Sequence, residues 1–389
     1  MTDYLEKAKT AEDDMIQWRR KIHENPELGF EEFETAKLVA KSLTDMGMEA
    51  EIGVGRTGVV ARIGNGEGPK IGIRADMDAL PIHEAVDLPF ASKVEGKMHA
   101  CGHDAHTAIL LGVAKMLHDM PDLSGEVRFL FQPSEEKWDA DGISGATAMI
   151  SDEALEDLDH VIALHVDSTK PVGEVHIGSG YMLAAVDTFY ATIFGEGTHG
   201  ASPHLGIDPV YIQSQVIGAI QSVRSRRTDP TSASVITVGS IHGGSAPNVI
   251  PDKVELTGTI RSFNEEIRSQ LHSELERALS VAKALGGDYS LEISRGYPSL
   301  YNDAGIVDLI KDVAKKNVGE AKTIDATPKM GAEDFSYMTQ KAPGAMFFLG
   351  AKYDDKHRPH HSPIFAISED AMKYGAAILA ESTMRLLQK

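Results

Sequence analysis

Amphipathic segments alternate with short apolar runs along the first half of the chain. Apolar positions three and four residues apart predict helices at about residues 10–25, 31–46 and 107–120. Runs of β-branched and other apolar residues predict strands at 57–63, 70–75, 126–131 and 159–166. Helices that alternate with strands buried on both faces are typical of an α/β fold, with a mostly parallel sheet flanked by helices.

The pattern changes near residue 178, where another order of elements begins. Between residues 187 and 294 the periodicity predicts strand, helix, strand, strand, helix and strand, which is the ferredoxin-like βαββαβ order. The chain then returns to helices and an apolar strand at Gly344–Gly350. We therefore expect one α/β domain, built from residues 1–178 and 296–389, that is interrupted by an inserted α+β domain at 179–295.

Charge and composition exclude several classes of function. The 389 residues contain 38 Lys and Arg against 58 Asp and Glu, for a net charge of −20. Such a field repels phosphates and anionic lipids, so we expect no nucleic-acid partner and no membrane-surface role. We find neither a signal-peptide pattern nor an apolar run of roughly 18 residues, and the single cysteine, Cys101, suits a reducing compartment. The prediction is a cytoplasmic protein.

The densest chemical signal lies around that cysteine. His99, His103 and His106 all stand within a few residues of Cys101. Thiolate and imidazole are preferred ligands of borderline-soft divalent metals. A structural or surface cluster remains the alternative interpretation of this segment by itself.

Further metal-binding side chains follow the predicted strands or lie in a late loop. They are Asp76, Asp78, Glu135, Glu136, His165 and His361. Ligand sites of open α/β sheets lie at the carboxyl ends of the strands. Each of these residues alone also fits turn capping, a solvated surface or a structural histidine. Together with the thiolate, they match a two-metal hydrolytic site, in which one glutamate binds metal while its neighbour handles a proton.

Six motifs carry a resemblance to a known family. They are Arg20–Leu28, Arg74–Pro81, Met98–Asp104, Phe131–Glu136, Gly331–Phe335 and His361–Pro363. They resemble the signatures of the N-acyl-amino-acid amidohydrolases, such as hippurate hydrolase, indole-acetyl-amino-acid hydrolase and N-acetyl-diaminopimelate deacetylase. That group belongs to the aminoacylase/carboxypeptidase G superfamily of dinuclear metallopeptidases. The resemblance extends from about residue 12 to the C-terminus.

The resemblance implies two divalent metal ions per chain, bridged by Cys101. His103 and His165 would complete one metal site, and Glu136 and His361 the other. The ions implied are zinc, manganese, nickel or cobalt, because all four accept mixed sulfur, nitrogen and oxygen ligands.

Two further carboxylates take roles beside the metals in this resemblance. Glu135 would be the general base, and Asp78 would be an outer partner that orients the site. Metal coordination brings the pKa of water towards about 7, so that Glu135 can take its proton near neutrality and pass it to the departing amine.

The inserted domain resembles the lid and dimerisation domain of the family. Gly197–His204 is similar to its glycine- and histidine-rich stretch, except that Thr198 stands where a glycine is usual. His199 would stabilise the oxyanion, from its own or the partner subunit, while Asn248 and Arg261 would hold a substrate carboxylate. A surface histidine and a strand-end salt bridge are the alternatives for His199 and Arg261. We expect a homodimer, with a homotetramer as the alternative.

These observations predict a metal-dependent amidohydrolase that acts on an N-acyl amino acid or a related small N-acylated compound. One alternative is a hydrolase with Cys101 as nucleophile and His103 or His106 as base. A non-catalytic metal-binding protein is the other. Activity that a chelator removes and metal restores separates the first prediction from both alternatives.

Overall fold

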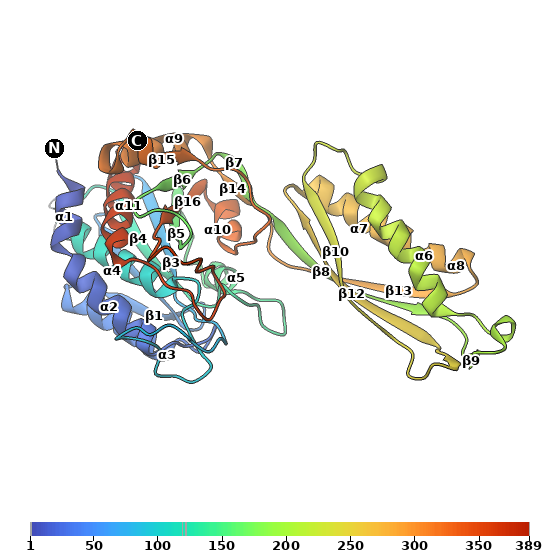
Figure 1. Ribbon diagram of the computed structural model, residues 1–389. Helices are drawn as coiled ribbons and strands as arrows, with labels where there is room; N and C mark the ends of the chain where they lie inside the picture. Colours follow the sequence, from blue (N-terminus) through green and yellow to red (C-terminus); the bar gives the residue numbers. More distant parts are fainter. Residues whose placement is uncertain (1, 119, 121–122, 389) are drawn as a thin grey trace. The chain divides into compact units, whose positions relative to one another are not determined.

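A computed structural model describes residues 2–118, 120 and 123–388, and it contains two compact units (Figure 1). Unit 1 comprises Met1–Gly180, Tyr301–Thr327 and Asp334–Lys389, and unit 2 comprises Tyr181–Leu300 and Pro328–Glu333. Unit 2 is therefore an insertion between two stretches of unit 1, with a short second return at 328–333. The insertion expected from the sequence was 179–295.

Eight strands of unit 1 form one sheet in the order β1-β2-β4-β3-β5-β16-β6-β15. They are β1 (Ala50–Val54), β2 (Gly58–Gly64), β3 (Lys70–Asp76), β4 (Glu126–Gln132), β5 (His160–Asp167), β6 (Val175–Ile177), β15 (Thr323–Asp325) and β16 (Gly344–Gly350). The central strands β4, β3, β5 and β16 are parallel to one another, so their carboxyl ends meet at one edge of the sheet. The predicted α/β fold with a mostly parallel sheet is confirmed.

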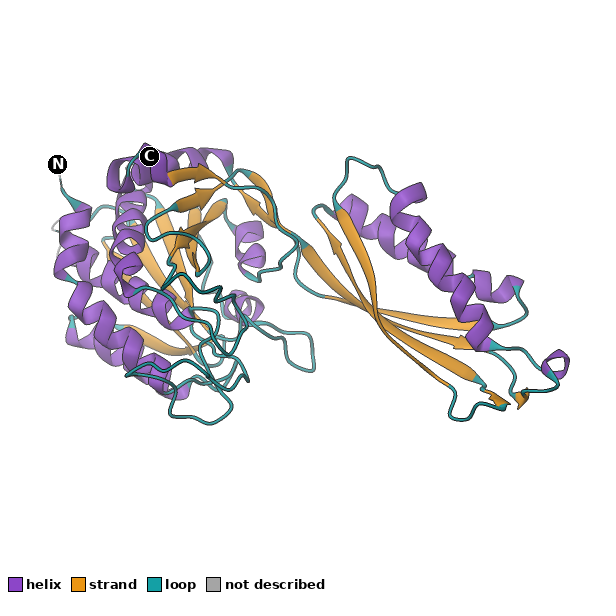
Figure 2. Cartoon of the chain, viewed as in Figure 1, coloured by secondary structure: helices purple, strands orange, loops and turns teal. Residues whose placement is uncertain are grey.

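Helices cover both faces of this sheet (Figure 2). They are α1 (Tyr4–Thr10), α2 (Glu12–Glu24), α3 (Phe33–Asp45), α4 (His103–His118), α5 (Gly145–Ser151), α9 (Ala304–Val318), α10 (Phe335–Lys341) and α11 (Met372–Leu386). Helix α4 packs against the sheet, α2 and α11, while α5 and α10 pack together on the other face. Among the described residues, none of the helices is long and apolar enough to cross a membrane.

Helix α4 occupies the centre of the unit 1 core. Ile109, Leu110, Leu111 and Val113 are all fully buried, because α4 lies between the sheet and the outer helices. Gly112 allows α2 to approach closely, since a Cβ there would lie 2.4 Å from the sulfur of Met15. The predicted helix at 107–120 begins at His103 instead, so that His103 lies in the first helical turn.

The predicted helix at 10–25 is α2, and a further helix, α1, precedes it. Asp3 caps α1 by accepting hydrogen bonds from the N–H groups of Leu5 and Glu6, and α1 ends before Ala11. Only Tyr4 and Ala8 of α1 are buried. Two buried positions give no periodic stripe, so the pattern did not indicate this helix.

Unit 2 has the βαββαβ order of a ferredoxin-like domain. Its main elements are β8 (Ala185–Phe194), α6 (Pro209–Ser222), β10 (Ser234–Gly243), β12 (Lys253–Ser262), α7 (Glu265–Leu279), α8 (Val281–Ala284) and β13 (Asp288–Arg295). The strands form an antiparallel sheet in the order β10-β12-β8-β13, with helices on one face (Figure 2). Two short ladders pair β9 (Thr198–His199) with β11 (Val249–Ile250), and β7 (Gly180–Leu183) with β14 (Leu300–Asn302).

A buried ionic cluster ties α2 to the start of α4. Asp104 Oδ2 lies 3.0 Å from Arg19 Nε and 2.9 Å from His23 Nδ1, and His23 Nε2 lies 3.1 Å from Glu84 Oε1. Burial alone would lower the pKa of His23, but the charge of Asp104 and the hydrogen bonds to both carboxylates outweigh it and raise this pKa to about 9. His23 is therefore an imidazolium at neutral pH.

This cluster predicts a pH-dependent stability difference between the wild type and His23→Gln. The pKa of His23 rises from 6.5 to about 9 on folding, so its contribution is complete below about pH 6.5 and is lost as the pH rises through about 9. We expect the wild type to exceed the variant by on the order of 1–3 kcal/mol near pH 6, and by much less near pH 10. Urea unfolding at both pH values measures this, with the exposed His204→Gln as control. A gap that does not change with pH would contradict the assignment.

Candidate metal centre

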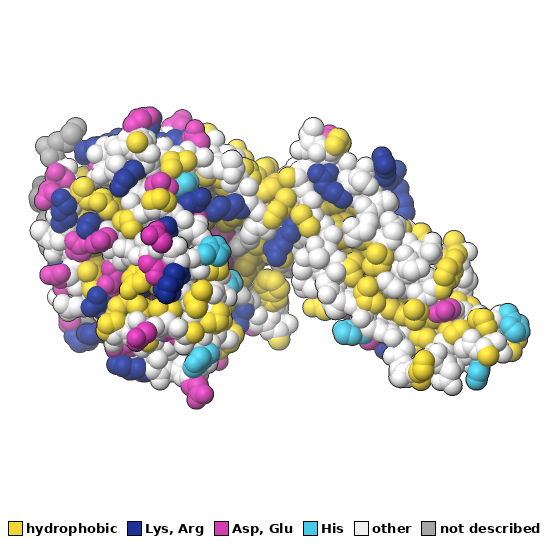
Figure 3. Space-filling view, viewed as in Figure 1, with side chains coloured by type: hydrophobic (Ala, Val, Ile, Leu, Met, Phe, Trp, Pro, Cys, Tyr) yellow, Lys and Arg dark blue, Asp and Glu magenta, His cyan; other side chains and the backbone are white. Residues whose placement is uncertain are grey.

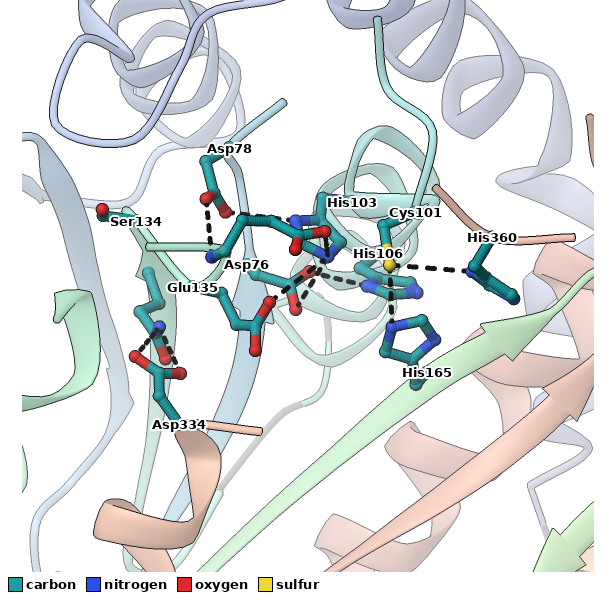
Figure 4. Close-up of polar contacts among 12 residues, drawn as sticks. Asp76, Asp78, Cys101, His103, His106, Ser134, Glu135, His165, Asp334 and His360 are labelled. Carbon is teal, nitrogen blue, oxygen red and sulfur yellow. Dashed lines mark hydrogen bonds and ion pairs between the residues drawn. The ribbon is translucent and has the colours of Figure 1, made fainter. Parts of the chain in front are cut away.

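The loops that leave the carboxyl ends of the central strands bring several metal-binding side chains and the predicted base together (Figure 4). Glu135 lies in the loop after β4, His165 lies in β5, and His360 lies in the loop after β16. Cys101 and His103 lie at the start of α4, which packs on β3. The parallel register puts Asp76 beside Gln132, so these loops start side by side. The site therefore lies where ligand sites of open α/β sheets are found.

His103 presents one nitrogen to a ring of carboxylates. Its Nδ1 lies 3.1 Å from Asp78 Oδ1, and its Nε2 is buried without a hydrogen-bond partner among the described residues. Nε2 lies 3.6 Å from Asp76 Oδ2 and 3.9 Å from Glu136 Oε1. Burial opposes the imidazolium, but Asp76 and Asp78 raise the pKa of His103 to about 10. The carboxylates around Nε2 therefore favour a positive charge there, which a proton or a divalent metal ion bound by Nε2 can supply.

Glu136 and His361 form a second part of the centre with Cys101. His361 Nε2 lies 3.0 Å from Glu136 Oε1, and one donor atom of each of the three residues lies within 4.8 Å of the others. The backbone N–H of Glu136 donates to Asp78 Oδ2 at 3.0 Å. The N–H of His361 donates to the carbonyl of Ala100 at 2.9 Å, which ties the late loop to the cysteine segment. This group has the composition expected for one of the two metal sites.

Two imidazoles approach the sulfur of Cys101 in different ways. His165 Nδ1 donates to the carbonyl of Val166 at 2.7 Å, which leaves the lone pair of Nε2 facing Sγ at 3.5 Å. His360 Nε2 instead accepts from the N–H of Ser168 at 3.3 Å, so its Nδ1 carries the proton and faces Sγ at 3.6 Å. His165 is thus arranged as a metal ligand, whereas His360 is arranged to donate a hydrogen bond to the thiolate.

The grouping of donor atoms differs from the metal site that the resemblance implies for Cys101, His103 and His165. The structure groups His165 with Cys101 and His360, and it groups His103 with Glu135 and Glu136, each within 4.8 Å. The rings of His103 and His165 lie 6.0 Å apart. Sequence analysis did not select His360, although its place beside His361 was a signal that could have identified it.

A buried network of Arg74, Asp334 and His106 holds Asp76 beside the centre. Arg74 bridges Asp76 (Nη1 to Oδ2, 2.7 Å) and Asp334 (Nη2 to Oδ1, 3.0 Å). His106 Nδ1 donates to Asp76 Oδ1 at 2.6 Å, and His106 Nε2 accepts from the N–H of Val166 at 2.9 Å. Burial lowers the pKa of His106 to about 4 against the opposing charge of Asp76. His106 is therefore a neutral structural link between β3 and β5.

The surroundings of Cys101 disfavour a cysteine nucleophile. Burial, followed by the charges of Glu136 and Glu135, raises the pKa of the thiol well above its ordinary value. Both nitrogens of His106 are already engaged, so it is not available as a base. A thiolate needs nearby cations under these conditions, and a metal ion supplies them.

The residues predicted in the inserted domain all lie in unit 2. His199 lies in β9 and pairs with Val249, and the N–H of Gly200 donates to the carbonyl of Asn248 at 2.8 Å, so His199 and Asn248 are neighbours. His199 Nδ1 accepts from the N–H of Ala201 at 3.0 Å, which leaves Nε2 to carry a proton. Strand β11 directly precedes β12, so His199 and Asn248 lie near the start of β12. Arg261 lies near the end of β12, and the structure does not bring it to this pair.

The fold and the donor set define a hydrolase with a metal centre at the edge of an α/β sheet, and comparison with known proteins gives its family. The sequence profile of Peptidase family M20/M25/M40 matches residues 72–385. The chain is 43% identical to N-acetyl-L-cysteine deacetylase of Bacillus subtilis over 384 residues (97% of this chain, 89% of the relative). It is 42% identical to thermostable carboxypeptidase 2 of Saccharolobus solfataricus over 385 residues (96% of each chain).

A solved structure agrees with these relatives. The crystal structure of the YXEP protein of Bacillus subtilis, described as a dinuclear metal binding peptidase from the M20 family, has a TM-score of 0.85 and 33% identity, covering 98% of this chain and 99% of that chain. The chain belongs to Peptidase family M20/M25/M40, and it is a hydrolase of the metallopeptidase and amidohydrolase type. The resemblance seen in the six motifs is confirmed.

Replacing Cys101 tests the bridging role. We expect Cys101→Ala to release metal and abolish hydrolysis, because the chain has no other thiolate that could substitute. Elemental analysis of the purified variant and the wild type measures the metal content, with His118→Ala, a half-buried histidine at the end of α4, as a control for handling. Two tightly bound metal ions per chain together with full activity would show that Cys101 is not the bridge.

Proposed function

We propose that this chain hydrolyses the amide bond of N-acyl amino acids or related small N-acylated compounds, with two divalent metal ions and Glu135 as general acid–base. The observation that carries the proposal is the gathering of one cysteine, several histidines and two adjacent glutamates at the sheet edge. Of the two glutamates, only Glu136 is needed as a metal ligand. The similarity to a deacetylase of an N-acylated amino acid supports the substrate class.

Glu135 is placed to move protons beside the ligands. Its Oε2 lies 4.0 Å from His103 Nε2, and its side chain is buried. Bound by these residues, two divalent ions would polarise the scissile carbonyl and lower the pKa of water. Glu135 takes the proton of the attacking water and returns it to the departing amine. Zinc, manganese, nickel and cobalt all suit the mixed donor set.

A panel of substrates and metals tests the proposal directly. N-acetyl, N-benzoyl and longer N-acyl amino acids are compared with short peptides, because a relative named as a carboxypeptidase favours peptide hydrolysis as the second candidate. We expect activity that a chelator removes and one of the four metals restores, with N-acyl amino acids preferred. Preference for peptides would support the second candidate, and no amide hydrolysis with metals loaded would overturn both.

We expect changes at the two glutamates to have different effects: one should lower kcat and the other should lower metal binding. Glu135→Gln keeps the shape but removes the base, so metal content should persist while kcat falls by about 10²–10⁴-fold. Glu136→Gln should weaken metal binding instead, because Glu136 contributes a ligand oxygen. Elemental analysis and kinetics at increasing metal concentration separate the two. Equal metal loss in both variants, with activity restored by excess metal, would contradict this division of roles.

The arrangement of unit 2 supports an active site shared between two chains. Lys253 and Arg261 lie eight residues apart in β12, which is about 26 Å at about 3.3 Å per residue. The segment that carries His199 follows Phe194, which pairs with Lys253, so His199 and Arg261 lie towards opposite ends of the sheet. One small substrate cannot touch both residues of the same chain. We therefore propose that His199 and Asn248 act in the active site of a partner subunit.

The exposed edge of unit 2 is consistent with a homodimer. Strand β10 is at the edge of its sheet, and its Val235 and Ile241 are exposed. Val210 and Tyr211 of α6 are also exposed, and Figure 3 shows hydrophobic side chains on the visible face of this unit, together with some Lys and Arg side chains. An unpaired edge with apolar neighbours favours pairing with a second copy of the chain.

Mixed dimers test the shared site. His199→Ala removes an oxyanion donor and should cut kcat by about 10²–10³-fold with the metals retained. Mixing these chains with Glu135→Gln chains should restore part of the activity, because some sites then contain both intact groups. Subunit exchange is confirmed by mass. Exchange without recovered activity would refute the arrangement between chains.

Arg261 is expected to act through substrate binding. Its guanidinium is expected to bind the substrate carboxylate equally in the ground state and the transition state, so Arg261→Ala should chiefly raise KM. Steady-state kinetics with an N-acyl amino acid and its amide analogue measures this, since the amide lacks the charge that Arg261 recognises. An equal increase in KM for both substrates would show that Arg261 does not bind the carboxylate.

A further inference from the structure

Glu32 stands at the N-cap position of α3 but does not cap the helix. Glu27 does so from outside, because its carboxylate accepts from the N–H of Glu34 at 3.0 Å and from the N–H of Thr35 at 2.8 Å. The side chain of Glu32 makes no capping bond and is fully buried. It is thus available for another role inside unit 1.

The carboxylate of Glu32 hydrogen-bonds to Ser134, in the turn next to Glu135, the proposed general base. Its Oε1 accepts from the backbone N–H of Ser134 at 2.8 Å, and its Oε2 accepts from the hydroxyl of Thr57 at 2.5 Å. No ion pair joins Glu32 to a basic side chain within the described part of the chain. Burial, followed by the charge of Asp78, raises the pKa of Glu32 to about 7 against these hydrogen bonds. A buried carboxyl group without a cation is costly, so its position calls for a function.

The turn at Ser134 needs to be held. Ser134 has a φ of 45°, in the left-handed region that residues with a Cβ rarely adopt. It is packed from two sides: a Cβ on Gly29 would lie 2.3 Å from Ser134 Oγ, and a Cβ on Gly145 would lie 1.5 Å from the carbonyl oxygen of Pro133. Three hydrogen bonds hold Ser134 in this conformation: its N–H donates to Glu32, its carbonyl accepts from the N–H of Gly145 at 2.9 Å, and its hydroxyl donates to the carbonyl of Lys137 at 3.0 Å.

Two carboxylates hold the residues on either side of Glu135. Glu32 accepts the N–H of Ser134, and Asp78 accepts the N–H of Glu136 at 3.0 Å (Figure 4 shows Asp78, Ser134 and Glu135). Asp78 also contacts a metal-ligand histidine, whereas Glu32 has no such second role. Glu32 therefore holds the base turn and Thr57, and these two hydrogen bonds of its side chain go to no proposed metal ligand.

We propose that Glu32 is a positioning residue for the general base, holding the Ser134 N–H so that the next side chain, Glu135, faces the metal centre. This inference rests on the proposed role of Glu135. A near-isosteric pair of variants of the full-length, metal-loaded protein separates geometry from charge. Glu32→Gln keeps the reach of the acceptor and loses the charge, whereas Glu32→Asp keeps the charge and withdraws the acceptor by one methylene.

We expect Glu32→Asp to lower kcat by about 10–100-fold with KM within about 2-fold, and Glu32→Gln to stay within about 3-fold of the wild type. Both should retain their metals in elemental analysis. Amide hydrogen exchange of the segment 129–137 should be faster in Glu32→Asp and unchanged in Glu32→Gln. The matched control is Glu31→Asp, since Glu31 is exposed and pairs with Lys97 at 3.1 Å.

Two further variants test whether the Ser134 contact, acting through Glu135, is the cause of the loss in Glu32→Asp. Thr57→Val removes the other hydrogen bond to Glu32 but leaves the Ser134 contact, so kcat should stay within about 3-fold of the wild type. Adding Glu32→Asp to Glu135→Gln should cause no further loss, because both changes act on the same base.

Several outcomes would overturn the inference. They are wild-type kcat and exchange in Glu32→Asp, a slow Glu32→Gln, equal loss in Thr57→Val, and loss of metal or of folded structure in proportion to activity. Full activity in Glu135→Gln would overturn the role of Glu135 and this inference with it. A slow Glu135→Gln beside a fast Glu32→Asp would overturn the positioning role alone.

Discussion

An excess of buried negative charge is the constraint on which the rest of the centre depends. Asp76, Asp78, Glu135 and Glu136 lie within one small region at the sheet edge, where Arg74 pairs with Asp76. Buried charges are costly unless they are paired. The imbalance raises the pKa of His103 and, after burial, that of the Cys101 thiol, and it explains why two divalent cations suit the donor set.

The sheet creates this constraint by its topology. Four parallel strands deliver their loops to the same edge, and α4 starts there with a histidine in its first turn. Part of this crowding is offset because the backbone N–H of Glu136 donates to Asp78 and Arg74 pairs with Asp76. The metal centre is thus a consequence of the fold as much as of its ligands.

Histidines of the same type perform different tasks because their second nitrogen has different partners. His165 donates a hydrogen bond from Nδ1 to a carbonyl, which leaves the lone pair of Nε2 for a metal. His360 accepts a hydrogen bond from a backbone N–H at Nε2, so its Nδ1–H faces the sulfur. His106 uses both nitrogens within the protein and stays neutral. The hydrogen bond on the far nitrogen, more than proximity to the centre, decides each role.

Sequence by itself determined the element types, the α/β class and the residues able to bind metal, because hydrophobic periodicity and side-chain chemistry are local properties. Tertiary structure alone decided which of these residues are partners. Glu32 and Ser134 lie 102 positions apart, and His360 reaches Cys101 from 259 positions away. The wide separation of His199 from Arg261 likewise follows from strand pairing in unit 2. Such contacts depend on register and loop geometry, which no local pattern of polar and apolar positions records.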